Sequence, residues 1–212
     1  ANFSEHGQLL RQFLFLQPDK CGFVEVTLPC ILGSPMMSML RRGLETSLFR
    51  GHDDLVYKIG PRVQNEVEIL KQLQGCEPKV CPRLLRSDKD SLCISLGEDV
   101  QGVFEEVNVE ILASQLFWHL YLVHECGIVH GDIKPSNVLR MSREPEQYVF
   151  CDWDSASKWQ PGMDIPQRRC TRGFCETLLF SCTSPHDFDL LGLYWTVAFM
   201  HACKSAKKRI GT

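Results

Sequence analysis

The residues most able to do chemistry lie in one short run, residues 128–139, which reads IVHGDIKPSNVL. Asp132 is followed by Lys134 two positions later and by Asn137 five positions later. A carboxylate can accept a proton, an ammonium group can neutralise an anion, and an amide oxygen can ligate a hard cation. A solvated polar loop is the other interpretation, but three such groups in this order between apolar residues favour a catalytic segment.

This run resembles the catalytic loop of protein kinases, whose pattern HRDxKxxN lies between apolar residues. The resemblance implies that Asp132 acts on the proton of the substrate hydroxyl and that Lys134 neutralises charge on the moving phosphoryl group. It also implies that Asn137 binds Mg²⁺ and helps to hold the nucleotide. Gly131 departs from the pattern, because many protein kinases have an arginine at this position.

A second match follows fifteen residues after Asn137, where an apolar run ends in the sequence DWD at residues 152–154. It is similar to the DFG segment of the family, and the resemblance implies that Asp152 binds Mg²⁺ beside the phosphates of ATP. Asp154 stands where the family usually has glycine. This additional carboxylate is expected either to attract a second cation or to face solvent.

Upstream, residues 55–58 (LVYK) resemble the strand whose lysine contacts the α- and β-phosphates of ATP, which implies that role for Lys58. The family pairs this lysine with a glutamate on a helix. At about 100° per residue, Glu66 lies on the apolar face of a predicted helix, whereas Glu68 points nearly the opposite way. Glu66 is therefore the predicted partner of Lys58 in the nucleotide site.

Three weaker matches lie farther from this centre. Residues 32–40 can be aligned with the glycine-rich loop that covers the phosphates, with Gly33 as the matching glycine. Thr171, in the run TRGF, is similar to the threonine that contacts the catalytic aspartate and lysine in serine/threonine kinases, so it is a candidate catalytic residue. Asp187 resembles the aspartate that hydrogen-bonds the catalytic-loop backbone, with Asp189 as the alternative register.

The elements that must position these residues are strands in the first half of the chain and helices in the second. Strands are expected over residues 22–32, 45–59 and 92–96, and helices over residues 62–74 and 109–125. The second strand region is expected to fold into a hairpin that turns near residues 51–54.

Together with the resemblance, this order implies an α+β fold of the bilobal protein-kinase-like type. Residues 1–212 are expected to form one domain. Its small β-rich lobe is expected over about residues 22–96 and its shortened helical lobe over about residues 109–212.

Composition narrows the expected partners. The chain has 23 basic and 26 acidic residues and a net charge of −3, which provides no field to attract nucleic acid or an anionic membrane. No apolar run reaches the roughly 18 residues of a membrane span, and the first residues lack the pattern of a signal peptide. We therefore expect no nucleic-acid or membrane partner and an intracellular protein, cytoplasmic or nuclear. Ala1 in place of Met indicates a piece of a longer protein.

The eleven cysteines are many for 212 residues, but their number is odd and no CxxC pair suggests a zinc site. Cys170 and Cys175 come nearest to a motif. Reduced thiols are the favoured interpretation, while a redox-sensitive pair stays open.

The expected activity is transfer of the γ-phosphate of ATP to serine or threonine of a protein substrate, with ATP and Mg²⁺ as the expected cofactors. Small-molecule phosphotransferases of the aminoglycoside and choline kinase type share HGD and DW, but they do not usually have a lysine at the position of Lys134. The other alternative is a pseudokinase that serves as a nucleotide-binding or scaffolding module, which the missing glycines and Asp154 favour. Against this alternative, inactive relatives commonly lack at least one of four residues that are all present here: Lys58, Asp132, Asn137 and Asp152. A protein regulator that supplies further helices is left open.

Overall fold

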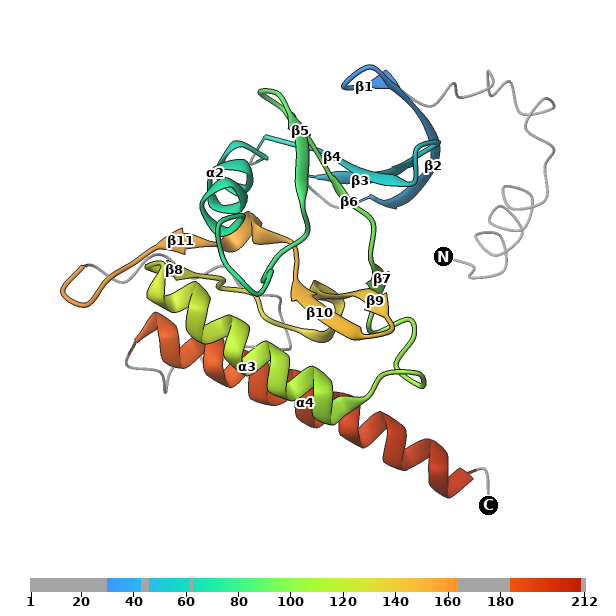
Figure 1. Ribbon diagram of the computed structural model, residues 1–212, viewed down its shortest axis with the longest axis vertical. Coiled ribbons are helices and arrows are strands. Elements are labelled where there is room, and N and C mark those ends of the chain that lie inside the picture. The colour runs from blue at the N-terminus through green and yellow to red at the C-terminus, as the bar shows by residue number, and fades with distance from the viewer. Residues whose placement is uncertain (1–29, 43–45, 62, 164–183, 211–212) are drawn as a thin grey trace, which may run out of the picture.

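The computed structural model describes residues 30–42, 46–61, 63–163 and 184–210. Its N-terminal part is a six-stranded antiparallel sheet in the order β1-β2-β3-β4-β6-β5 (Figure 1). The strands are β1 (Cys30–Ile31), β2 (Ser34–Arg42), β3 (Ser47–Gly51), β4 (Leu55–Ile59), β5 (Leu84–Ser87) and β6 (Ser91–Ser95). This sheet and the helix α2 (Val63–Leu73) are called the small lobe below.

The β3–β4 hairpin turns where the sequence predicted. Gly51 is required at the end of β3, because a Cβ on it would lie 2.7 Å from Cε2 of Tyr57. Asp54, just before β4, takes a left-handed φ of 56°. The predicted strand over residues 45–59 is therefore two strands, and β6 corresponds to the predicted strand over residues 92–96.

Both predicted helices are present within one residue of their expected bounds. On α2, one side buries Val67, Leu70 and Leu73 against β5 and β6. The second helix, α3 (Val109–Glu125), follows Asn108, whose side-chain oxygen accepts hydrogen bonds from the first free backbone N–H groups of the helix. None of the described helices has the length and apolar run that a membrane crossing needs.

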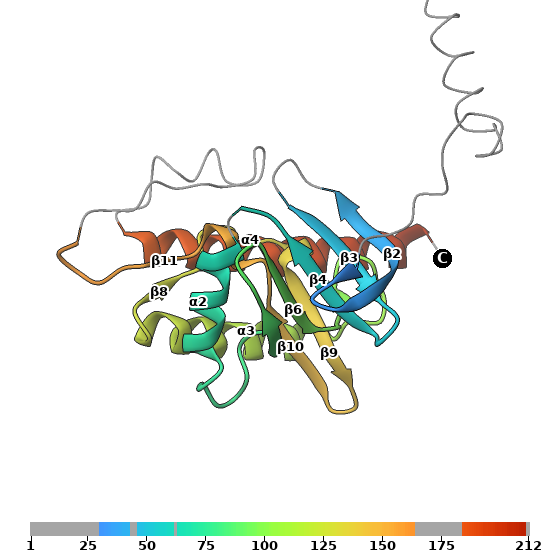
Figure 2. The same ribbon diagram turned by 90° about the horizontal axis from the view of Figure 1, so that it is seen from above.

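The remaining elements form the large lobe together with α3. A three-stranded sheet in the order β10-β9-β7 and a two-stranded pair, β8 and β11, lie between α3 and the small lobe (Figure 1). These elements are β7 (Glu98–Asp99), β8 (Ile128–Val129), the 3₁₀ helix η2 (Pro135–Asn137), β9 (Val138–Arg143), β10 (Glu146–Phe150), η3 (Trp153–Ser155) and β11 (Ser157–Lys158). The last helix, α4 (Pro185–Ile210), runs beside α3 (Figures 1 and 2).

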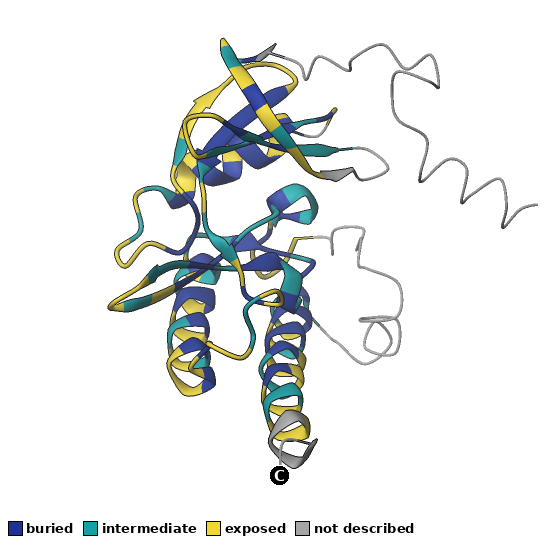
Figure 3. Cartoon of the chain, turned by 90° about the vertical axis from the view of Figure 1, so that its right-hand side faces the viewer, coloured by how far each residue is buried: buried dark blue, intermediate teal, exposed yellow. Residues whose placement is uncertain are grey.

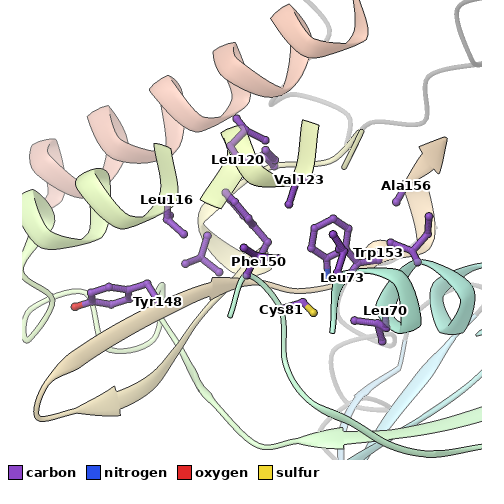
Figure 4. Packing of buried hydrophobic residues seen from close by; sticks show 14 of the residues in the cluster. Leu70, Leu73, Cys81, Leu116, Leu120, Val123, Tyr148, Phe150, Trp153 and Ala156 are labelled. Atoms are coloured by element: carbon purple, nitrogen blue, oxygen red, sulfur yellow. The ribbon is translucent and has the colours of Figure 1, made fainter. Parts of the chain in front are cut away.

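One hydrophobic cluster spans both lobes. It includes Leu70 and Leu73 from α2 as well as Leu120 from α3, and the rings of Phe150 and Trp153 meet edge to face with centroids 6.4 Å apart (Figure 4). In the described part of the large lobe, α3 and α4 each bury one side and expose another (Figure 3). The two-lobed α+β architecture expected from the sequence is confirmed, and the region that joins the lobes contains the candidate site.

Candidate active site

The three catalytic-loop residues converge on one carboxylate. Nζ of Lys134 donates a 2.6 Å hydrogen bond to Oδ2 of Asp132. Nδ2 of Asn137 donates to the same oxygen at 3.1 Å and to the backbone oxygen of Asp132 at 2.9 Å. Pro135 opens η2, where its fixed φ suits the first helical position, and this turn brings Asn137 back toward Asp132. The Asp132 carboxylate is therefore oriented by two donors.

The loop that carries Asp132 is anchored by Asp189 on α4. Its two carboxylate oxygens accept hydrogen bonds from the backbone N–H groups of His130 and Gly131 at 2.7 and 2.8 Å. The preferred prediction of Asp187 for this role is wrong, and the alternative register is correct. Two residues turn a helix by about 200°, so Asp187 is exposed while Asp189 is buried. Asp187 instead caps α4 reciprocally with Ser184.

Gly131 is explained by the same close packing. It has a φ of 78°, and a Cβ on it would lie 2.8 Å from the backbone oxygen of Ser155. An arginine, as in many protein kinases, has no room at this position without a backbone shift. A second close approach occurs at Gly192 on α4, where a Cβ would lie 2.9 Å from the backbone oxygen of Ile133. Both glycines allow the catalytic loop to lie directly against its neighbours.

The second group of predicted residues surrounds Lys58 on β4. Its buried Nζ lies 2.7 Å from Oε2 of Glu66, 2.7 Å from Oδ1 of Asp152 and 2.9 Å from Oδ1 of Asp154. Glu66 is buried on the inner side of α2 and Glu68 is exposed, as the helical periodicity predicted. The structure thus brings Lys58, Glu66 and Asp152 together across the boundary between the lobes.

Glu66 also holds the DWD segment in place. Its second oxygen accepts a hydrogen bond from the backbone N–H of Trp153 at 3.1 Å. Asp152, the residue before it, has a left-handed φ of 63°, and at this turn the carboxylates of Asp152 and Asp154 both reach Lys58. Asp154 was expected to attract a cation or to face solvent, and no sequence signal indicated that it pairs with Lys58.

The cluster carries more negative than positive charge, because three carboxylates surround one ammonium group. Burial raises the pKa of Glu66 to about 7; Lys58 opposes this shift, and the charges of Asp154 and Asp152 add to it. Burial alone would lower the pKa of Lys58, but the neighbouring carboxylates outweigh it and raise that pKa. Burial alone would raise the pKa of Asp152, but Lys58 outweighs it and lowers that pKa.

These residues fit Mg²⁺ and a nucleotide phosphate. Oδ1 of Asn137 is buried and has no hydrogen-bond partner within the described part of the chain. The side chain of Asp152 is 35% exposed. Amide and carboxylate oxygens are the hard ligands that Mg²⁺ prefers, and the surplus negative charge around Lys58 attracts a cation. Asn137 and Asp152 therefore remain the candidate metal ligands.

Of the two remaining predicted site residues, Gly33 does not join this group. Thr171 lies outside the described residues. Gly33 has a φ of 79° in the turn between β1 and β2, next to Ser34, whose hydroxyl donates to Asp53 in the β3–β4 turn. Lys58 on β4 lies opposite Leu48 on β3, and Leu48 lies opposite Arg41, at the end of β2 that is far from Gly33. The expectation that Gly33 covers the phosphates is therefore corrected: the glycine serves a hairpin turn, and the β2–β3 connection near Lys58 includes residues 43–45, which are not described.

Comparisons with known proteins agree with this geometry. The protein kinase domain family matches residues 56–183. The chain is 28% identical to casein kinase II subunit alpha' of Saccharomyces cerevisiae over 156 residues, which is 69% of this chain and 45% of that protein. It is 26% identical to serine/threonine-protein kinase prp4 of Schizosaccharomyces pombe over 123 residues, 50% of this chain and 25% of that protein. The matches thus span less than half of either relative, while the family match covers more than half of this chain, and the chain belongs to the protein kinase family.

Proposed function

We propose that the chain transfers the γ-phosphate of ATP to a serine or threonine hydroxyl of a protein substrate. The observation that carries this proposal is that the catalytic loop lies next to the group of carboxylates around Lys58. The backbone N–H of Cys151 donates to the backbone oxygen of Asn137 at 2.9 Å, so Asp152 lies directly beside the catalytic loop. This adjacency of Asp152 and the catalytic loop supports the proposal.

In this proposal Asp132 accepts the proton of the substrate hydroxyl as that oxygen attacks the γ-phosphorus. The new bond joins the hydroxyl oxygen to phosphorus, the bond to the β–γ bridging oxygen breaks, and ADP leaves. Lys134, 2.6 Å from Asp132, neutralises charge on the transferred group while it keeps the carboxylate oriented. Asp189 keeps the loop backbone in position for this step.

Lys58 binds the α- and β-phosphates in this proposal, and Glu66 keeps the ammonium group aimed at them. Asn137 and Asp152 would hold Mg²⁺, which neutralises phosphate charge when it is bound. The three carboxylates now engage Lys58 at 2.7 to 2.9 Å, so a phosphate oxygen must replace at least one of them. Asp154 is the carboxylate that the proposed chemistry does not use.

A serine or threonine acceptor is supported by Lys134 and by the similarity to a serine/threonine-protein kinase. The pairing of Asp154 with Lys58 favours a second candidate, a module that binds nucleotide but transfers no phosphate. In that case the Lys58 cluster would act as a binding site, and Asp132 would have no acceptor to activate.

The test is a phosphate-transfer assay with Mg²⁺ and ATP on a mixed serine, threonine and tyrosine peptide library, beside nucleotide binding by calorimetry. We expect Asp132→Asn to lower the transfer rate by at least about a hundredfold while the affinity for ATP changes by less than about threefold, because the carboxylate acts on the hydroxyl and not on ATP. Wild-type turnover by Asp132→Asn would refute the assigned role.

A matched pair of variants on α2 tests the nucleotide site. Glu66→Gln should weaken ATP binding, whereas Glu68→Gln, which changes an exposed carboxylate on the same helix, should not. Tight binding of ATP by the wild type without any transfer, on peptides or on small-molecule acceptors, would select the second candidate function.

A further inference from the structure

Two cysteines that are far apart in the sequence meet at the boundary between the lobes. Sγ of Cys76 lies 3.7 Å from Sγ of Cys126, and 50 positions separate the two residues. Both thiols are free and partly exposed. The other described free cysteines have no such thiol contact: Cys81, Cys93, Cys151 and Cys203.

The local structure holds both residues in place. Cys76 follows α2, and its backbone N–H donates to the backbone oxygen of Leu73 at 3.0 Å. Cys126 caps α3, with its N–H bonded to the oxygen of Leu122 at 3.1 Å. A hydrogen bond also joins the two helix ends, because Nε2 of Gln72 donates to the backbone oxygen of Cys126 at 2.8 Å. The two thiols therefore lie close together where a hydrogen bond already joins the end of α2 to the end of α3.

We propose that Cys76 and Cys126 form a reversible disulfide that links the end of α2 to the end of α3. The co-reactant is a low-molecular-weight disulfide such as oxidised glutathione. One thiolate attacks it to give a mixed disulfide and one reduced glutathione, and the second thiolate then displaces the other glutathione. Two protein thiols are oxidised, one glutathione disulfide is reduced to two glutathione thiols, and the two protons of the protein thiols end on those glutathione thiols.

The position of this bond gives it a mechanical consequence. The helix α2 carries Glu66, and the end of α3 leads through β8 to the catalytic loop at His130 (Figures 1 and 2). The sulfurs are in contact while Glu66 is paired with Lys58, so the disulfide is compatible with that pairing. Oxidation therefore fastens α2 in the arrangement in which the Lys58–Glu66 pair exists.

The test uses the full chain with oxidised glutathione at pH 8.5, followed by alkylation, proteolysis without reductant and mass spectrometry. We choose an alkaline buffer because burial, and then the neighbouring Cys126 thiol, raises the pKa of Cys76 to about 11. The expected product is a peptide pair joined through Cys76 and Cys126 that dithiothreitol separates. The melting temperature should rise by roughly 5–15 °C, since the bond closes a long loop of the unfolded chain.

Cys76→Ser and Cys126→Ser should each abolish both the cross-linked peptide and the rise in melting temperature. Cys203→Ser, a matched change at another partly exposed thiol, should leave both unchanged. Because the peptide is measured in the wild-type chain, the outcome does not depend on how well a variant folds. Protein that stays reduced, keeps glutathione on one cysteine, or links other cysteines such as Cys170 and Cys175 would overturn the proposal.

Discussion

Removal of the Asp154 charge tests the balance between attraction and repulsion in the group of charges around Lys58. Asp154→Asn keeps the shape of the side chain but removes one of the three carboxylates around Lys58. The lost attraction across 2.9 Å is worth about 6 kcal/mol at an effective dielectric constant of about 20. This number alone would predict a severe loss of stability.

Repulsion offsets that attraction. Carboxylate oxygens of Glu66, Asp152 and Asp154 all lie within 4.8 Å of one another. At the same dielectric constant, each repulsion that Asp154 experiences is therefore at least about 3.5 kcal/mol. When Glu66 is ionised, at pH 8, two such repulsions equal or exceed the one attraction. At that pH we expect Asp154→Asn to leave the free energy of unfolding unchanged or to raise it by about 1 kcal/mol.

The effect of Asp154→Asn on stability depends on pH, because it depends on the protonation of Glu66. The pKa of Glu66 is raised to about 7 in the folded protein, so the folded state retains a proton that the unfolded chain releases above its ordinary pKa of 4.5. The contribution of Glu66 to stability is therefore fully present below pH 4.5 and is lost as the pH rises toward 7. Asp154→Asn lowers the pKa of Glu66 and reduces this loss. The variant should melt at or below the wild type at pH 5, where protonated Glu66 no longer repels Asp154, and about 2–4 °C above it at pH 8.

The assay is thermal unfolding without nucleotide between pH 5 and 8, with Asp90→Asn as the control at an exposed carboxylate. ATP binding in the same variants supplies a second readout, because Asp154→Asn leaves Lys58 with one charged competitor fewer and should tighten binding by about threefold to tenfold. A fall in the melting temperature of more than about 5 °C at pH 8 relative to Asp90→Asn would show that attraction prevails and that this reasoning is wrong.

Three further predictions concern stability. Burial lowers the pKa of His119 on α3 to about 4, so the wild type should lose about 3 kcal/mol as the pH falls from 6.5 to 4, and His119→Gln should remove that part of the slope in urea titrations. Gly131→Ala should cost roughly 2 kcal/mol or more from strain and contact, whereas Gly162→Ala, with a φ of 95° and open space around its Cβ, should cost only about 1 kcal/mol; equal losses in urea midpoints would argue against the contact with Ser155. Asp189→Asn should cost about 2–3 kcal/mol, because an amide cannot accept from both loop N–H groups, and the same change at exposed Asp187 should cost under 1 kcal/mol.

The local parts of this protein could be predicted from the sequence because covalent geometry and helical periodicity determine them. Asp132, Lys134 and Asn137 lie within six positions, so a single tight turn brings them together whatever surrounds it. The choice of Glu66 over Glu68 followed from the 100° step of a helix that must bury one side. The order of strands first and helices later, together with the resemblance of the catalytic loop to that of protein kinases, implied the two-lobed α+β architecture.

Packing between elements decided the rest. The choice between Asp187 and Asp189 depended on which side of α4 faces the catalytic loop. The single matching glycine, Gly33, could not locate the phosphate-covering loop, because the sequence alone did not show which strands pair. Asp154 reaches Lys58, and Cys76 reaches Cys126, only because the lobes pack through a shared core. Side chains separated by 50 positions or more approach each other through the summed contacts of the whole fold, and no local pattern in the sequence encodes that distance.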